Sequence, residues 1–224
     1  ADGKYLNYSP ETGNVTEIFK DNISRFRSFM ITGFTKDSVD MINNNETPKL
    51  SALCLHNSTV YPWNRVCYGV INGKPNLRIE NRYIPSGPTT TDENANMMFW
   101  VGVMLGKPKK YKNIHKLWDF KDVKTNFFNA ARYGMATQFY WNGAFICSHE
   151  LLLNELLPMA YKGLYSVGVL PKDAEKYLKV IKDRVRSHNS SEWMTRNYRS
   201  LLENHKRFDA MQILTSKMYE KQEK

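Results

Sequence analysis

The chain has 224 residues, of which 42% are hydrophobic and 24% are charged, and 32 Lys+Arg against 22 Asp+Glu give a formal net charge of +10. This composition excludes wholesale disorder, and the length allows a sizeable core in one large domain or two small ones. The charge is uneven: residues 1–106 carry 10 basic and 10 acidic residues, and residues 107–224 carry 22 and 12. Such a basic half is typical of proteins that bind nucleic acid or acidic membranes, and also of helical bundles coated with lysine.

Cysteine content and apolar runs indicate a compartment. Cys54, Cys67 and Cys147 are an odd number without a Cys-x-x-Cys pair, so we expect buried thiols rather than a disulfide framework or a zinc site. The first twenty residues contain no basic start followed by an apolar run, as a signal peptide would. The longest apolar stretch, Met97–Leu105, spans 9 residues, too few to cross a membrane. We therefore expect a cytoplasmic protein without a membrane partner.

The first elements in chain order are a helix, a loop and two short strands. Apolar spacing over 15–34 predicts a helix that ends near Gly33, and the segment 43–48 reads as a polar loop. The runs 51–55 and 66–71 are rich in apolar and β-prone residues, which favours two strands.

A hairpin follows. The pair Asn72-Gly73 predicts a tight turn, and the segment after it alternates strictly. One predicted face carries Leu77, Ile79, Asn81 and Tyr83, and the other carries Arg78, Glu80 and Arg82. If the first face packs on the core, the charged face lines a wet or ligand-filled cavity or meets solvent.

The rest of the chain is predicted to be helical. Thr91 or Asp92 can cap a buried helix that runs to Leu105, and a basic loop follows at 107–112. Pro158 should kink or break one of the later helices. Those later helices are expected at 120–138, 148–167, 171–187, 190–205 and 207–221.

Together these elements predict an α+β fold, with a small antiparallel sheet followed by a C-terminal helical bundle. We expect a first region at 1–106, which contains the hairpin at 50–84. A helical region at 107–224 should pack on it to form one compact unit.

The triplet Arg78-x-Glu80-x-Arg82 is the most informative local motif. A carboxylate is a hard oxygen ligand for Mg²⁺, and flanking guanidinium groups can hold phosphate oxygens in bidentate fashion. Arg65, on the preceding strand, could join them across the hairpin. The alternative is an exposed strand face whose charges pair with one another.

Several motifs carry a resemblance to a known family. Tyr61–Arg65, Pro75–Arg82, the turn Gly87–Thr89 and the helix start Asp92–Asn96 resemble the second family of glutamate–cysteine ligases, carboxylate–amine ligases of the glutamine synthetase superfamily. Later stretches resemble an uncharacterised bacterial subgroup of that family, and the whole likeness covers roughly residues 50–218. These later stretches are 130–139, 155–160 and 193–197.

The resemblance implies a reaction and a site. ATP would phosphorylate a substrate carboxylate, and an amine would then displace phosphate to form an amide, as in glutathione biosynthesis. Glu80 matches the carboxylate that holds Mg²⁺, and Arg82 matches the arginine that faces the transferred phosphoryl group. Arg65 and Arg78 match arginines on the nucleotide phosphates or the acyl phosphate, so Arg65 and Arg82 would be catalytic and Arg65 and Arg78 nucleotide-binding. The implied partners are a nucleotide and small amino-acid-type substrates.

One family feature is missing. Such ligases carry an earlier Glu-x-Glu strand that completes the metal cluster, and these 224 residues contain no Glu-x-Glu. The chain resembles the C-terminal half of a protein about twice as long. Because one carboxylate cannot hold several divalent ions, we expect the chain alone to be inactive and to need the N-terminal half of the same fold as its partner.

Two other classes of function stay open. The chain could be a non-catalytic regulatory or interaction module that retains the fold. It could also bind nucleic acid through the lysines of 107–112 and the helix at 172–186, although only Tyr111 and Tyr177 interrupt these basic segments, and we do not expect nucleic acid as a partner. His56 could be a further metal ligand or a hydrogen-bonded core histidine.

Overall fold

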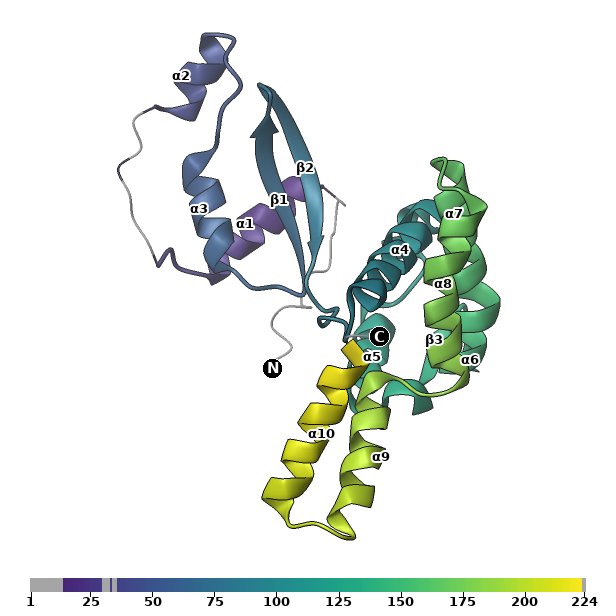
Figure 1. Cartoon of the computed structure of the whole chain (residues 1–224). Helices are drawn as coiled ribbons and strands as arrows, with labels where there is room; N and C mark the ends of the chain where they lie inside the picture. The colour runs from purple at the N-terminus through teal and green to yellow at the C-terminus, as the bar shows by residue number, and fades with distance from the viewer. Residues whose placement is uncertain (1–13, 30–32, 34–35, 223–224) are drawn as a thin grey trace. The chain divides into compact units, whose positions relative to one another are not determined.

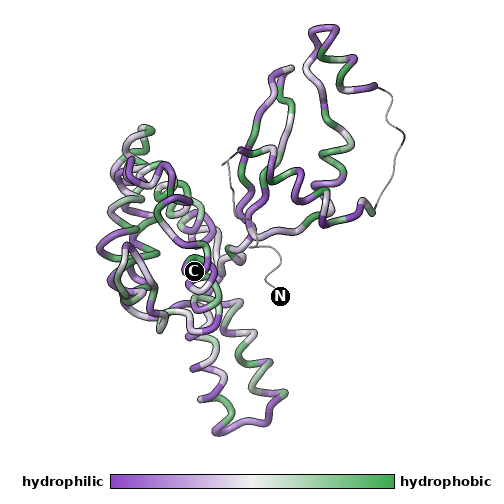
Figure 2. Tube along the Cα trace, turned by 180° about the vertical axis from the view of Figure 1, so that it is seen from behind, coloured by the Kyte–Doolittle hydropathy of each residue, from purple (hydrophilic) through white to green (hydrophobic). Residues whose placement is uncertain are grey.

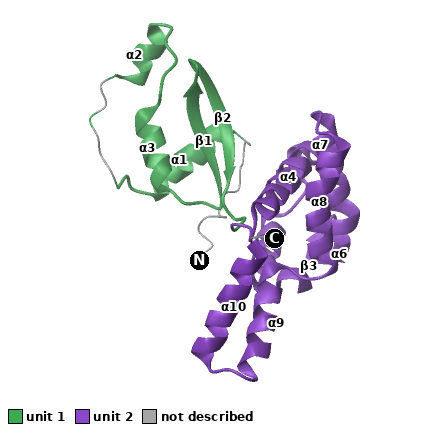
Figure 3. Ribbon diagram, viewed as in Figure 1, with its two compact units in different colours: residues 1–85 green, residues 86–224 purple. Residues whose placement is uncertain are grey.

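The computed structural model describes residues 14–29, 33 and 36–222 (Figure 1). The predicted α+β class is confirmed: the chain is 65% helical and has two small two-stranded antiparallel sheets. It divides into two compact units, residues 1–85 and 86–224 (Figure 3), and each is described by itself. The division lies after Pro85 rather than after residue 106, because the helix that follows packs with the later helices.

In its described residues, unit 1 combines three helices with a hairpin. In chain order its elements are α1 (Val15–Arg25), α2 (Ser38–Asn43), α3 (Ser51–Thr59), β1 (Asn64–Ile71) and β2 (Lys74–Asn81). The first helix ends at Arg25, since Phe26 already has an extended backbone with φ −120° and ψ 127°. Residues 30–32 and 34 of the helix expected at 15–34 lie outside the described residues.

The strand expected at Ser51–Leu55 is wrong, because these residues open α3. Leu50 has the left-handed conformation, with φ 48°, which turns the chain immediately before the helix. Serine, alanine and leucine fit a helix well, and a short apolar run cannot distinguish a strand from a buried helix by periodicity.

The hairpin itself is confirmed. Strands β1 and β2 are antiparallel, and Arg65 lies opposite Glu80 while Cys67 lies opposite Arg78. The turn residues Asn72 and Gly73 have φ values of 51° and 74°, as a type I′ turn requires.

The charged face of the hairpin, and not the face of Leu77 and Ile79, lies toward α3. Cys67, on the face of Arg65 and Glu80, is buried, and the amide Nδ2 of Asn57 in α3 lies 3.9 Å from its Sγ. Leu77 and Ile79, on the opposite face, are each 53% exposed. The covering helix presents a polar side chain to the hairpin, so the charged face rather than the apolar face of β2 lies on its side.

Unit 2 is mostly helical. Its main helices are α4 (Thr90–Gly106), α5 (Phe120–Tyr133), α7 (Leu157–Ser166), α8 (Pro171–Arg186), α9 (Ser190–Leu202) and α10 (Arg207–Gln222). Shorter elements are the 3₁₀ segments η2 (Lys109–Lys116) and η3 (Gly134–Ala136), the helical turn α6 (Ser148–Glu150), the π-helical segment η4 (Leu151–Leu156), and strands β3 (Gln138–Trp141) and β4 (Ala144–Cys147). The later helices therefore form close to their expected ranges, and most of the expected basic loop at 107–112 is 3₁₀-helical.

Pro158 disturbs its helix without ending it. The chain stays helical from Ser148 to Ser166, but the turns just before Pro158 widen into η4. Because proline lacks an N–H, the ordinary i to i−4 bond cannot form at that position.

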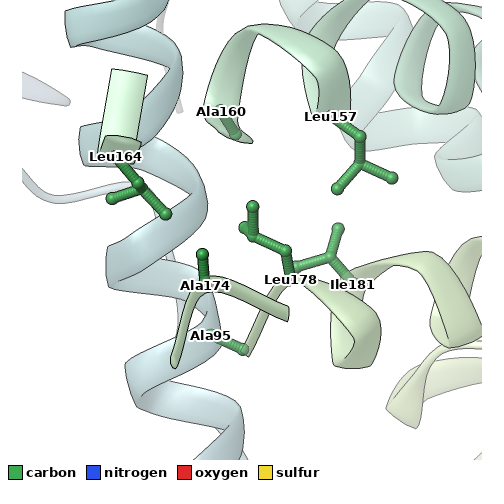
Figure 4. Packing of buried hydrophobic residues seen from close by; sticks show 7 residues of the cluster. All are labelled: Ala95, Leu157, Ala160, Leu164, Ala174, Leu178 and Ile181. Carbon is green, nitrogen blue, oxygen red and sulfur yellow. The ribbon is translucent and has the colours of Figure 1, made fainter. Parts of the chain in front are cut away.

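The core of unit 2 lies where α4, α7 and α8 meet (Figure 4). Its buried members are Ala95, Leu157, Ala160, Leu164, Ala174, Leu178 and Ile181. Three glycines allow α4 and α7 to approach closely: a Cβ atom on Gly102 would lie 2.6 Å from the carbonyl oxygen of Ala160, and Gly106 and Gly163 face each other's helices with even less room. In the part of the chain that the structure describes, none of the helices combines the length and apolar character needed to cross a membrane.

Candidate functional site

Arg65 and Glu80 form the centre of the charged hairpin face. The Nε and Nη2 atoms of Arg65 lie 2.7 and 2.6 Å from the same carboxylate oxygen, Oε2 of Glu80. Its Nη1 atom donates to the backbone oxygens of Asn57 (3.0 Å) and Ser58 (3.3 Å) at the end of α3. The side chain is only 11% exposed, so Arg65 is held in place from two sides and serves mainly to position Glu80.

Arg82 extends the cluster from the end of β2. Its Nε lies 3.1 Å from Oε2 of Glu80, and its guanidinium carbon lies 4.6 Å from the centre of the Tyr61 ring. The Nη1 atom is buried and bonds to none of the described residues. A buried cationic donor without an acceptor is unusual in a folded protein, so this atom has hydrogen-bonding capacity that the described residues do not use.

Arg78 completes the set of three arginines. It lies opposite Cys67, and its Nη1 passes across Gly69, where a Cβ atom would come within 2.9 Å of it. The residue is exposed, and no hydrogen bond joins its side chain to another described residue. A glycine at position 69 therefore leaves room for a guanidinium that is available to a ligand.

The electrostatic balance of the cluster is positive. Arg65, Arg78 and Arg82 against Glu80 give a formal charge of +2. Burial by itself raises the pKa of Glu80, but the hydrogen bond from Arg65 and the charges of all three arginines outweigh it and lower that pKa below its usual value. Glu80 is therefore ionised at neutral pH, and the surplus positive charge favours an anion.

The cluster does not fit a metal held by this chain alone. Oε2 of Glu80 already accepts a hydrogen bond from Arg65 and forms an ion pair with Arg82, and the described residues contain no group of three His, Cys, Asp or Glu side chains placed to hold an ion. His56 is buried in α3 and its Nε2 donates to the backbone oxygen of Phe26 at 2.8 Å, so it is a structural histidine here. Among the described residues, neither Glu80 nor His56 has the neighbours that a Mg²⁺ site needs.

A second polar site lies in unit 2, in an open cavity of about 610 Å³ between the start of α4, the end of α8, and α9 and α10. Arg184 donates to Asp92 Oδ1 at 2.5 Å and to Asn96 Oδ1 at 2.7 Å. Lys221 Nζ lies 4.5 Å from the centre of the Trp193 ring. The sequence gives no local sign of this site, because residues 92 positions apart form its ion pair.

Asp92 has a structural role in that cavity. Burial by itself raises the pKa of Asp92. Hydrogen bonds from Thr89 and Arg184 and the charge of Arg184 lower this pKa by more, so the net shift is downward. Thr89 also caps α4 by accepting from the backbone N–H of Asp92. The ion pair thus ties the start of α4 to α8, and its two charges neutralise each other.

Comparison with known proteins adds no further constraint: the chain matches no family model, no curated protein and no solved structure.

Proposed function

We propose that the β1–β2 hairpin binds the phosphates of a nucleotide, as part of an ATP-dependent carboxylate–amine ligase of the glutamate–cysteine ligase type. The observation that carries the proposal is the buried Nη1 of Arg82, which bonds to no described residue, beside a second available guanidinium on Arg78. A phosphate oxygen would supply the absent acceptor, and planar guanidinium groups match phosphate geometry. The resemblance of the hairpin motifs to this ligase family supports the same assignment.

In such a reaction the γ-phosphoryl group of ATP passes to a substrate carboxylate, giving an acyl phosphate and ADP. An amine then attacks the acyl carbon, the bond from that carbon to the phosphate oxygen breaks, and the amine loses a proton as the amide forms. Arg82 and Arg78 would neutralise charge on the phosphoryl oxygens, and Arg65 would keep Glu80 and Arg82 in register.

The chain alone is expected to bind phosphates without turning ATP over. It contains no Glu-x-Glu strand, and the single carboxylate of its cluster is already paired with arginines. We therefore assign phosphate binding to these residues, and metal binding to a part of the enzyme that this sequence does not contain.

The test is calorimetric titration of the chain with ATP, first with EDTA and then with Mg²⁺. Arg82→Gln should weaken binding in EDTA by about tenfold, because a charge-assisted hydrogen bond is lost. Arg78→Gln should weaken it less, since that arginine contributes mainly charge. Arg196→Gln is the matched control, because it removes one exposed arginine from α9 in unit 2.

Equal loss of affinity in all three variants would mean that ATP responds only to net charge, and would overturn the site. Unchanged affinity in Arg82→Gln would remove the residue on which the proposal depends. The ligase assignment is tested separately, by supplying the chain with a Glu-x-Glu-bearing N-terminal half and measuring phosphate release with amino-acid pairs. If phosphates were bound but the reaction released no phosphate, the protein would be a nucleotide-binding module, and the ligase assignment would be overturned.

A further inference from the structure

The outer edge of β2 has a defined hydrogen-bonding phase. The backbone N–H of Arg82 donates to the backbone oxygen of Trp63 at 2.9 Å, so these two residues form a hydrogen-bonded pair. The next pair in the register, Asn64 and Asn81, therefore has no direct hydrogen bonds between its two residues. Hydrogen-bonded and non-hydrogen-bonded residue pairs alternate along antiparallel strands, so the backbone groups of the even-numbered residues of β2 bond to β1. The N–H and C=O groups of Leu77, Ile79 and Asn81 therefore point away from β1.

The two outer edges of this sheet differ in whether other residues bond to their backbone groups. On the outer edge of β1, Asn57 Nδ2 donates to the oxygen of Val66 at 2.8 Å, and Cys54 Sγ lies 3.7 Å from the oxygen of Tyr68. On the outer edge of β2, none of the described residues bonds to the backbone of Leu77 or Ile79. The edge of β1 is covered by α3, whereas the edge of β2 offers a row of backbone groups to another strand.

The side chains beside the β2 edge would suit such a strand. Leu77 and Ile79 are each 53% exposed and stand on the same face, beside Val66 and Tyr68 on the neighbouring strand. Figure 2 shows hydrophobic and hydrophilic positions mixed along the hairpin. A strand added at this edge would cover Leu77 and Ile79 with apolar residues of its own.

The other face of β2 sets the charge of the partner. It carries Lys74, Arg78 and Arg82 against Glu80, and Glu80 is already paired within the hairpin. A neighbouring strand would place its alternate side chains directly beside this row, where acidic residues are attracted and basic residues are repelled.

We propose that the outer edge of β2 is a docking edge for an extended segment that alternates apolar and acidic residues. The segment would pair with the backbone of Leu77, Ile79 and Asn81, place its apolar residues beside Leu77 and Ile79, and place its carboxylates beside Arg78 and Arg82. Docking uses the backbone edge together with Arg78 and Arg82, so its carboxylates draw on the same guanidinium groups that the proposed function assigns to nucleotide phosphates. A second copy of the chain is a poorer partner, because its β2 would bring Lys74, Arg78 and Arg82 against the same residues.

The experiment follows amide hydrogen exchange by NMR in the full chain. The probe is a short acetylated peptide in which valine alternates with glutamate, and its twin has lysine in place of glutamate. The acidic peptide should slow exchange at Leu77, Ile79 and Asn81, and the basic peptide should bind at least tenfold more weakly. Exchange at Val66 and Val70, on the opposite edge, should not change.

Two proline variants isolate the edge. Ile79→Pro removes a backbone N–H that points away from β1 and leaves the hydrogen bonds to β1 intact. It should weaken binding of the acidic peptide by about tenfold. Val70→Pro is the matched control, because residue 70 lies opposite Pro75 and directs its N–H away from β2. This control should bind the acidic peptide as the parent chain does.

Equal binding of the two peptides, or equal loss in both proline variants, would overturn the proposal. Slow exchange at Leu77 and Ile79 in the protein alone would do so as well. If that protection rose with protein concentration, a second copy would be the occupant, and if it did not, another part of the same chain would be. A variant that loses peptide binding but keeps ATP binding, or that loses ATP binding but keeps peptide binding, would show that this edge and the phosphate site are separate.

Discussion

Arg65 and Glu80 face each other across the hairpin, and two nitrogens of the arginine, Nε and Nη2, reach one oxygen of the glutamate at 2.7 and 2.6 Å. The same oxygen meets Nε of Arg82 at 3.1 Å. Glu80 therefore acts as the common anchor of two arginines. This relationship makes it a charge partner within the chain, and the proposed phosphate binding is assigned to the arginines around it.

Glu80→Gln separates these two roles. The change leaves Arg65 without its anionic partner while that side chain is largely buried, and the free energy of unfolding of unit 1 should fall by about 1–2 kcal/mol. It also raises the cluster from +2 to +3, so ATP in EDTA should bind about threefold more tightly. Denaturant unfolding and calorimetric titration measure the two effects, and loss of ATP binding in EDTA would contradict the charge-partner role.

The Asp92–Arg184 pair predicts a pH dependence in unit 2. The pKa of Asp92 is lower in the folded protein than in the unfolded chain, so its stabilising effect is complete above the usual pKa of an aspartate. That effect is lost as the pH falls through the folded-state pKa. Asp92→Asn should therefore lower the free energy of unfolding by about 2 kcal/mol near neutral pH, with a difference from the parent chain that shrinks in acid.

Thermal unfolding across this acid range measures the difference. Asp209→Asn is the control, because Asp209 is also in the first turn of a helix but is exposed and forms no ion pair with an arginine among the described residues. It should lower stability only slightly at every pH. A difference for Asp92→Asn that persisted unchanged in acid would mean that packing, and not the ion pair, explains the loss.

Local chemistry in the sequence is sufficient to predict the turns and most helices. Asn72-Gly73 predicts its hairpin because both residues must adopt positive φ. The same pair occurs at Asn142-Gly143, with φ values of 52° and 89°, between β3 and β4. This second hairpin was missed although its signal was present, because its strands have only four residues each and follow a strong helical pattern.

What the sequence could not predict depends on contacts between distant segments. The alternation of β2 identifies two faces, but it cannot say which face another element covers, and α3 covers the charged side with Asn57 rather than with apolar groups. The arginine cluster follows from spacing, whereas the buried Nη1 of Arg82 requires the structure. The contact between Asp92 and Arg184 likewise arises only when α4 and α8 pack together.

Gly73→Ala tests the turn. The residue has φ 74°, a conformation that an L side chain adopts only with strain, and the space around it is open. The free energy of unfolding of unit 1 should therefore fall by about 1 kcal/mol for backbone reasons alone. Asn76→Ala, within β2, is a contrasting change that leaves the turn intact, and denaturant unfolding should distinguish the two by the larger loss in Gly73→Ala.

Gly163→Ala tests the contact between α4 and α7. Gly163 is buried in α7, and a Cβ atom there would overlap the backbone of Gly102 and Gly106 in α4. Because backbone atoms of two packed helices cannot move aside as a flexible side chain can, the helices must separate and loosen the core around Ala160 and Leu164. The free energy of unfolding should fall by about 3 kcal/mol, well beyond the effect of alanine on helix propensity, which would by itself favour the helix.

Lys162→Ala is the matched control, since Lys162 is the exposed neighbour in the same helix and alanine suits a helix interior. Calorimetric unfolding should show a lower transition temperature for Gly163→Ala and little change for Lys162→Ala. A small loss in Gly163→Ala would mean that α4 and α7 are not in backbone contact. A large loss confined to Gly163→Ala would identify this glycine contact as the feature that allows the close packing of α4 on α7.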